Sequence, residues 1–360
     1  MAQDLARDRL EFNLVLNMIG PLVAVQGFTA TEVEQQIRRV SALSEKLGTH
    51  ASLIPALALK LSNLSAAGNR PASHALALQI SALAEGGSEA DRLIAHRYLS
   101  MSLVFRGNFQ PAIDEALHFL ALYDPARHAQ QLVSIGPANH AVMVMVGLAE
   151  SYAILAQADQ AQHWCGQALL TARTDGRART LAQALAFAAC FPSALLGNVD
   201  ALTGYATELQ AVSESHGLTQ WQGHATLFSG ISLMKQGRIE PGLALARQGV
   251  HLLVTGHADH KLWYIVYAQA CEAAGAFDEA WHGLELGALN IAFGYSWLDA
   301  EYLRIRGRLK LIGGDRDAAK QDFEAALALA LEQGATLFIE RARQDQELLY
   351  KKLTRPIAGP

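Results

Sequence analysis

Small residues recur along the chain at intervals of about 40 residues, and this spacing limits the possible folds more than any other feature of the sequence. The series consists of Gly27, Gly68, Gly107, Ala156, Gly197, Gly237, Gly275 and Gly314. Six of its steps are 38 to 41 residues long, and one, from Gly107 to Ala156, is 49 residues. A second series of glycines falls about 20 residues after most of these positions. Because glycine just beyond a helix end adopts the left-handed conformation that satisfies the last carbonyls, two glycines per repeat predict two helices per repeat.

Between these glycines the apolar residues have a helical period. In residues 317–331, Ala319, Phe323, Ala326 and Ala330 are spaced by three and four residues, as on one face of a helix. Five residues after several of the first-series positions stands a small residue, which allows paired helices to approach closely: Ala112, Ala161, Gly242, Ala280 and Ala319. No alternating apolar and polar run predicts a strand, so we expect an all-α fold without a β-sheet.

The composition agrees with helices packed on helices. The 360 residues are 51% apolar and only 18% charged, which excludes a disordered chain. The cysteines Cys165, Cys190 and Cys271 are few and odd in number, which favours a reducing compartment and three small buried side chains. The net charge of −5 argues against direct nucleic-acid binding.

Part of the repeat carries a family resemblance. Gly307, Gly314, Ala319, Phe323 and Ala326 have the spacing of the small and aromatic signature positions of a tetratricopeptide repeat (TPR). The longer period resembles the superhelical sensor region of the maltose-regulon type of transcriptional activator. More closely, the chain resembles the C-terminal repeats of bacterial proteins that join a class III nucleotide cyclase or another output domain to a signalling ATPase. The segments that carry this likeness are 27–34, 122–128, 297–304, 314–319 and 329–335.

The period and the resemblance together predict one TPR-like solenoid domain. We expect a right-handed α-solenoid of about eight helical hairpins over residues 1–354, hinged at the first glycine series, with an insertion at 123–140 and a flexible tail at 355–360. The function implied is a non-catalytic regulatory and protein-interaction scaffold in bacterial signalling or transcriptional regulation. The alternative is a small-molecule-sensing superhelix that controls an output domain or a partner.

Motifs for catalysis and cofactor binding are not evident. No Gly-x-x-x-x-Gly-Lys-Ser/Thr loop predicts phosphate binding, and no Gly-x-Ser-x-Gly elbow predicts a nucleophile. His251, His257 and His260 lie close in sequence, but neither a Cys-x-x-Cys pair nor a His-Glu-x-x-His motif accompanies them. We therefore expect no enzyme activity, no cofactor and no metal.

The predicted partner site lies on the inner face of the solenoid. In tetratricopeptide-type solenoids the first helix of each hairpin lines this face, so the resemblance selects inner positions by their distance from each hinge glycine. They are Arg97, Met101, Phe105, Met143, Glu150, Phe187, Phe191, His224, Gln269, Arg304 and Arg308. An apolar middle flanked by charges suits an amphipathic peptide in a groove; equally, the Met and Phe residues fit ordinary packing between helices. A protein or peptide partner is expected, or a small-molecule inducer.

The insertion is a second candidate site. Pro125 and Pro137 prevent one continuous helix here, so we expect the chain to loop out between two hairpins. Loops on a rigid scaffold often carry binding groups, and the residues this one offers are Tyr123, Arg127, His128 and His140. The alternative is a structural splice that covers the seam between neighbouring repeats.

The first residues bear on partners and location. The N-terminus mixes acids and bases before its first apolar run, unlike a secretory signal. The uncharged stretches at 13–31 and 181–199 contain polar residues and proline, which favours buried helices over membrane spans. We expect a cytoplasmic protein. The early apolar residues Leu10, Phe12, Leu14 and Leu16 lack a polar cap, which favours a homodimer or a preceding output or ATPase domain.

Overall fold

The computed structural model describes residues 2–26, 30–48, 50–132, 135, 138–255, 262–291 and 297–354. Within these ranges the regular structure is helical and no strand occurs, so the predicted all-α class is confirmed. Gly27, Gly256, Gly294, His257, His260, Pro137 and the tail at 355–360 lie outside the described residues.

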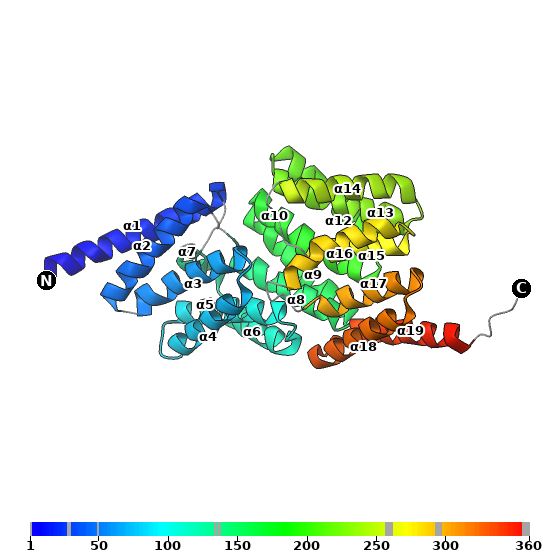
Figure 1. Ribbon diagram of the computed structural model, residues 1–360. Coiled ribbons are helices and arrows are strands. Elements are labelled where there is room, and N and C mark those ends of the chain that lie inside the picture. The colour runs from blue at the N-terminus through cyan, green and yellow to red at the C-terminus, as the bar shows by residue number, and fades with distance from the viewer. Residues whose placement is uncertain are drawn as a thin grey trace, which may run out of the picture. The chain divides into compact units, whose positions relative to one another are not determined.

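The helices follow one another as hairpins (Figure 1). In chain order they are α1 (Ala2–Gln26) and α2 (Thr31–Leu47), α3 (His50–Ala66) and α4 (Arg70–Ala84), α5 (Glu89–Phe105) and α6 (Phe109–Leu122), then α8 (His140–Ile154) and α9 (Ala158–Asp175). The helix formed by α10 (Ala178–Ala184), η2 (Leu185–Cys190) and α11 (Phe191–Leu196) precedes α12 (Val199–Ser215). The last hairpins are α13 (Thr219–Lys235) and α14 (Ile239–Thr255), α15 (Leu262–Ala273) and α16 (Phe277–Ile291), and α17 (Asp299–Ile312) and α18 (Arg316–Gln333), before α19 (Thr336–Thr354).

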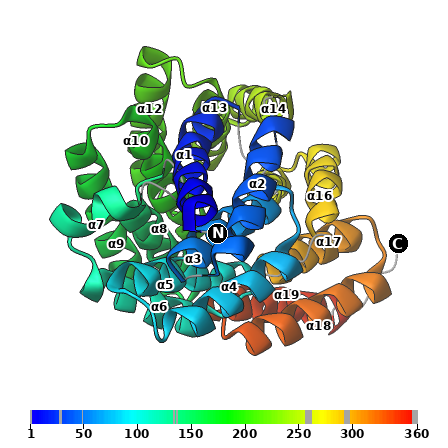
Figure 2. The same cartoon turned by 90° about the vertical axis from the view of Figure 1, so that its left-hand side faces the viewer.

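The chain divides into two compact units. The first contains Met1–Phe105 and Gln110–Gly147, and the second contains Arg106–Phe109 and Leu148–Pro360. In the first unit, α1 packs on α2, and α3 packs on both α4 and α5. In the second, α17, α18 and α19 lie side by side, as both ribbon views show (Figure 2). The single domain expected from the sequence stays a prediction.

Several first helices contact the first helix of a neighbouring hairpin. In the first unit α3 contacts α5. In the second, α15 contacts both α13 and α17. Second helices pack on their hairpin partners and often also on the next helix, as α4 does on α5 and α12 on α13. On α18 the buried residues include Ala319, Phe323, Ala326 and Ala330. On α13 the buried residues, among them Trp221, His224 and Phe228, lie around most of the helix, so buried polar groups there need hydrogen-bond partners.

One turn of the repeat has alanine in the left-handed conformation that glycine adopts in the others. Ala156, between α8 and α9, has a φ of 58° and is the one non-glycine residue with a positive φ in the described ranges. Glycines with φ values of 77° to 82° hold the equivalent turns at Gly107, Gly197, Gly237 and Gly275. Alanine pays about 1 kcal/mol for this conformation, so the hairpin geometry at Ala156 is imposed by the packing of the helices on either side.

The insertion contains a helix where the sequence analysis expects a loop. The short helix α7 (Pro125–Leu132) begins at one of the two prolines that exclude a continuous helix. Proline is compatible with the first helical turn, where its missing N–H has no partner to lose. Pro125 therefore starts α7, after α6 has ended at Leu122.

Two surface features bear on location and partners. The segment Ala178–Leu196 is long and apolar enough to cross a membrane, and 67% of its most apolar window is buried by the fold, as in a core helix of a soluble protein. On α1, Phe12 and Leu16 are buried against α2, whereas Leu10, Leu14 and Met18 are more than half exposed. The predicted association through this end of the chain stays a prediction.

Candidate ligand-binding residues on the inner helices

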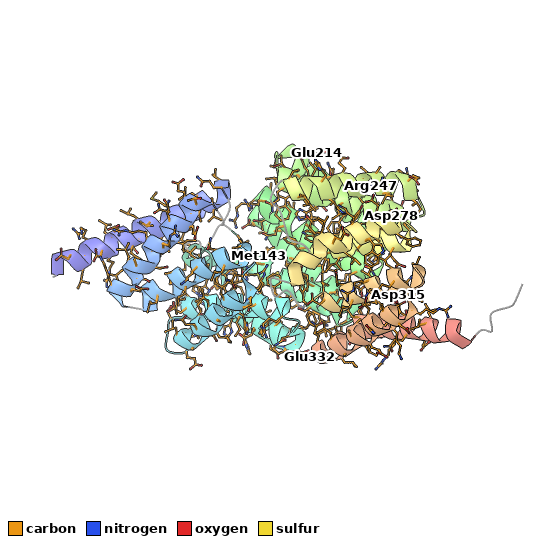
Figure 3. The ribbon with its side chains drawn as sticks, viewed as in Figure 1. Met143, Glu214, Arg247, Asp278, Asp315 and Glu332 are labelled. Atoms are coloured by element: carbon orange, nitrogen blue, oxygen red, sulfur yellow. The ribbon has the colours of Figure 1, made fainter. Side chains whose placement is uncertain are left out.

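The inner-face candidates all lie on first helices of hairpins. Arg97, Met101 and Phe105 are on α5; Met143 and Glu150 are on α8, where Figure 3 labels Met143; Phe187 and Phe191 are in the α10–α11 helix; His224 is on α13, Gln269 on α15, and Arg304 and Arg308 on α17. The residues from Arg97 to Met143 belong to the first unit and those from Glu150 onward to the second. Each group is therefore considered within its own unit.

Arg97 is a buried cation that has no acidic partner among the described residues. Its side chain is 5% exposed, its Nη1 lies 3.4 Å from the Met101 sulfur, and its Nε has no hydrogen-bond partner among the described residues. Its guanidinium carbon is 5.2 Å from the centre of the Tyr98 ring. Burial lowers the pKa of Arg97 and the neighbouring Tyr98 acts in the opposite direction, but an arginine remains charged at neutral pH. The fold thus holds a buried positive charge without an acidic neighbour among the described residues.

A second buried arginine, which is not among the residues predicted from the sequence, contacts the last residue of α5. Arg70, at the start of α4, is 6% exposed and its guanidinium carbon is 3.9 Å from the centre of the Phe105 ring. Burial lowers the pKa of Arg70 to about 9, and stacking on an aromatic face offsets part of the cost of burying the charge. The signal in the sequence is an Arg-Pro pair at a helix start, which repeat spacing alone does not mark.

Glu150 is a buried carboxyl group in the second unit. It is 7% exposed and no described residue forms an ion pair with it. Burial raises the pKa of the Glu150 carboxyl well above its usual range. A carboxyl group in this environment is poised to accept a cationic or hydrogen-bond-donating group from a ligand.

The unpaired carboxyl group should make stability depend on pH. Its folded-state pKa is raised, so its unfavourable contribution is absent below the unfolded pKa of about 4.5 and grows as pH rises toward the folded pKa. We expect Glu150→Gln to raise the free energy of unfolding by about 2 kcal/mol at pH 8 and to have little effect at pH 4. Urea denaturation at both pH values measures the difference. Glu332→Gln, at an exposed position on α18 (Figure 3), is the matched control; an equal effect of both variants would contradict the prediction.

The aromatic candidates of the second unit belong to a packed cluster around Trp263. The Phe187 ring stacks on Trp263 with centroids 5.1 Å apart, and the rings of Phe191 and His224 approach it at 5.9 and 5.0 Å. Phe191 and His224 are fully buried, whereas Phe187 is half-buried. Phe187 lies within η2, a π-helical turn, and such turns are frequent at functional sites. Of the three, Phe187 is the one that is partly exposed.

The C-terminal candidates take part in an ion network within the fold. Arg304 donates to both carboxylate oxygens of Glu301, at 2.8 and 2.9 Å, and to Asp345 at 2.7 Å. Arg308 donates to Glu272 at 2.8 Å and to Asp345 at 2.7 Å, while Gln269 donates to Glu301 at 3.0 Å. Unlike Arg97 and Glu150, the charges of Arg304 and Arg308 are matched by neighbouring acids.

The insertion residues interact mainly with one another and with α5. Arg127 is exposed and its guanidinium reaches Asp124 at 3.0 Å and Glu89 at 3.4 Å. His128 is buried; its Nδ1 accepts from the Asp124 N–H at 2.9 Å, and the ring of Tyr123 is 6.1 Å away. His140 is buried, with Nε2 3.1 Å from the Leu132 carbonyl. The ion pair of Arg127 with Glu89 connects α7 to the start of α5.

The cysteines are confirmed as buried free thiols. Cys165, Cys190 and Cys271 form no disulfide. Burial raises the pKa of each thiol, to about 12 for Cys271, which keeps them protonated and unreactive at neutral pH.

Comparison with known proteins identifies the fold. No family model and no curated protein matches the chain. Among solved structures, the chain is similar to a Rap protein in a crystal structure with competence and sporulation factor, with a TM-score of 0.63 and 14% identity over 95% of this chain and 99% of that one. The fold is that of a TPR-like helical-repeat protein. At this identity the likeness establishes the fold alone.

Proposed function

We propose that this chain is a non-catalytic scaffold that binds a peptide, or an extended segment of a partner protein, along its inner helices. In this proposal Arg97 receives an anionic group of a ligand that binds the first unit, and Glu150 separately receives a cationic or hydrogen-bond-donating group of a ligand that binds the second. The site would serve a regulatory role in bacterial signalling in the cytoplasm, as the resemblance to signalling-protein repeats implies.

The observation that carries the proposal is the contrast between matched and unmatched buried charges. Arg304, in the second unit, is enclosed by two carboxylates, whereas Arg97 and Glu150 are equally buried and have no oppositely charged neighbour in the part of the chain that the structure describes. A buried unpaired charge lowers stability, so its presence is best explained by a ligand that pairs with it. The similar Rap protein was crystallised in complex with competence and sporulation factor, which supports the binding of another molecule by this type of fold.

Selection from a library of displayed random heptapeptides tests the proposal. The wild-type chain should enrich related sequences of two kinds, acidic ones that bind at Arg97 and basic ones that bind at Glu150. Because a charge-assisted hydrogen bond contributes about 1.5–3 kcal/mol, binding of an enriched acidic peptide should weaken about tenfold or more in Arg97→Met, and binding of an enriched basic peptide should weaken likewise in Glu150→Gln. Arg38→Met is the control, since Arg38 is 66% exposed on α2 and pairs loosely with Glu34.

Circular dichroism of each variant separates loss of binding from loss of fold. Methionine at position 97 keeps much of the side-chain volume and removes a buried charge, so the variant should remain helical. Two results would overturn the proposal: enrichment of no related sequences, or enriched peptides that bind Arg97→Met and Glu150→Gln as tightly as wild type.

A further inference from the structure

Three potential metal ligands lie together where α5 and α6 pair. They are His96 on α5 and Glu115 and His118 on α6. One ligand atom from each side chain lies within 4.8 Å of the ligand atoms of the other two. His96 and Glu115 are each about one-quarter exposed, and His118 is exposed, so an ion from solvent has access to all three.

The helical geometry explains how the three side chains meet. Glu115 and His118 are three residues apart, which places them on the same face of α6. His96 reaches them from the neighbouring helix: its Nδ1 lies 2.6 Å from a carboxylate oxygen of Glu115, and its ring centroid is 5.4 Å from that of His118, with 52° between the planes. The cluster therefore has two ligands from one helix and one from another, all within the first unit.

The donor set suits a zinc-type ion. Two imidazole nitrogens and one carboxylate oxygen form a common three-ligand set for Zn²⁺, with water in the fourth position. Metal–ligand bonds of about 2.0–2.1 Å in a tetrahedron place neighbouring ligand atoms roughly 3.3 Å apart. The spacing in the cluster runs from 2.6 Å to less than 4.8 Å, so small rotations of the three side chains bring them to that geometry.

We propose that His96, Glu115 and His118 bind one divalent transition-metal ion with zinc-type coordination, completed by water. The ion takes the place of the proton shared between His96 and Glu115 and joins α5 to α6. It also fixes α5 next to Arg97, the residue after His96. The metal site stands on its own geometry and does not depend on peptide binding.

Titration of the full chain, first freed of metal by dialysis against a chelator, tests the site. Isothermal calorimetry with Zn²⁺ should show saturable binding of one ion per chain. Co²⁺ should give the visible absorption of a four-coordinate site with nitrogen and oxygen ligands. Zinc should also raise the unfolding temperature, because an ion that binds only the folded state stabilises it.

Matched histidine variants locate the ion. We expect His118→Ala and His96→Gln each to weaken zinc binding by at least about tenfold and to abolish the cobalt spectrum. His163→Ala, which removes an exposed histidine on α9, should bind as wild type does. The double variant His257→Ala, His260→Ala should do so too, which excludes the other sequence cluster as the source of binding.

Two results would overturn the inference. One is the lack of saturable zinc binding by wild type. The other is equal binding by wild type, His118→Ala and His96→Gln. Since His118 is exposed, His118→Ala should remain folded, and its circular dichroism spectrum and unfolding temperature without metal verify this. Peptide selection by the metal-free chain is a separate measurement, so failure of either proposal leaves the other intact.

Discussion

Gly230→Ala is expected to lower the free energy of unfolding by about 3 kcal/mol or more. A Cβ atom at Gly230 on α13 would lie 2.4 Å from the backbone nitrogen of Ala246 and 2.6 Å from the carbonyl oxygen of Gly242, both on α14. Side-chain rotation relieves neither contact because both atoms belong to the backbone. The two helices must move apart, which opens the packed interface along their length.

The same close approach recurs along this helix pair. A Cβ at Gly242 would lie 2.7 Å from the Met234 nitrogen, and one at Gly249 would lie 2.4 Å from the Leu227 nitrogen. Three glycines thus allow α13 and α14 to pack backbone to backbone. Moving the helices apart for one added methyl group loses contacts at all three positions, which places the expected cost at the upper end of the range for overpacked cores.

Gly204→Ala is the matched control for Gly230→Ala. Gly204 also lies in the interior of a helix, α12, but nothing lies within 4 Å of an added Cβ there. Alanine favours a helix over glycine by about 0.8–1 kcal/mol, so Gly204→Ala should unfold at the same or a higher urea concentration than wild type. If Gly230→Ala has the wild-type urea midpoint, the close backbone packing of α13 and α14 is wrong.

The sequence predicts the helical hairpins because their determinants are local. Turn glycines and the three- to four-residue spacing of apolar side chains act within one repeat, and repetition makes the signal visible. The small residues expected at helix contacts are buried, as Ala112, Ala161, Ala280 and Ala319 show, and Gly242 meets the backbone of α13. Even Ala156, without glycine's freedom, adopts the turn conformation that the period assigns to it.

The pairing of charges is not predictable in the same way. Arg97, Glu150 and Arg304 are all predicted from their position on a first helix. This position does not reveal which charged side chains lie next to each of them in the fold. The partner of Arg304 outside its own helix is Asp345, which is 41 residues away on α19. The candidate metal cluster escapes a search for short motifs for the same reason, since His96 lies 19 residues before Glu115 on a different helix.

Arg304→Met is expected to lower the free energy of unfolding by about 3–5 kcal/mol. Arg304 is 7% exposed in its side chain, and Glu301 and Asp345 are 2% and 4% exposed. Removing one member of a buried ion pair leaves its partners charged and desolvated, which costs more than the pair contributes when intact. The network has three arginines, Arg304, Arg308 and Arg341, against Glu272, Glu301 and Asp345, so the loss of one arginine leaves a net negative charge inside the fold.

The network also ties distant parts of the second unit together. Glu272 lies on α15, Glu301 on α17 and Asp345 on α19, and Arg341 on α19 donates both to Glu301 at 2.7 Å and to the Leu195 carbonyl at the end of α11. The effect of Arg304→Met should therefore appear in hydrogen exchange of α15, α17 and α19 together. Urea denaturation followed by circular dichroism measures the change in stability.

The surface pair Arg173–Glu208 supplies the control. It has bidentate contacts of 2.8 and 3.0 Å, but its side chains are 50% and 35% exposed. Exposed ion pairs contribute about 0–1 kcal/mol, so Arg173→Met should cost far less than Arg304→Met. If the two variants lose equal stability, the buried network does not hold these helices together.

Acid titration gives the sign of the Glu301 contribution. Burial alone would raise the pKa of Glu301, but Arg304 and Arg341 outweigh it and hold the pKa at about 2. Because the folded pKa is depressed, the stabilisation is fully present above the unfolded pKa of about 4.5 and is lost as pH falls toward 2. Glu301→Gln should remove this part of the pH dependence.

The double variant Arg304→Met, Asp345→Asn restores the charge balance of the buried network. It should therefore be more stable than the sum of the effects of its two single variants predicts. Simple additivity would show that the two side chains are not coupled.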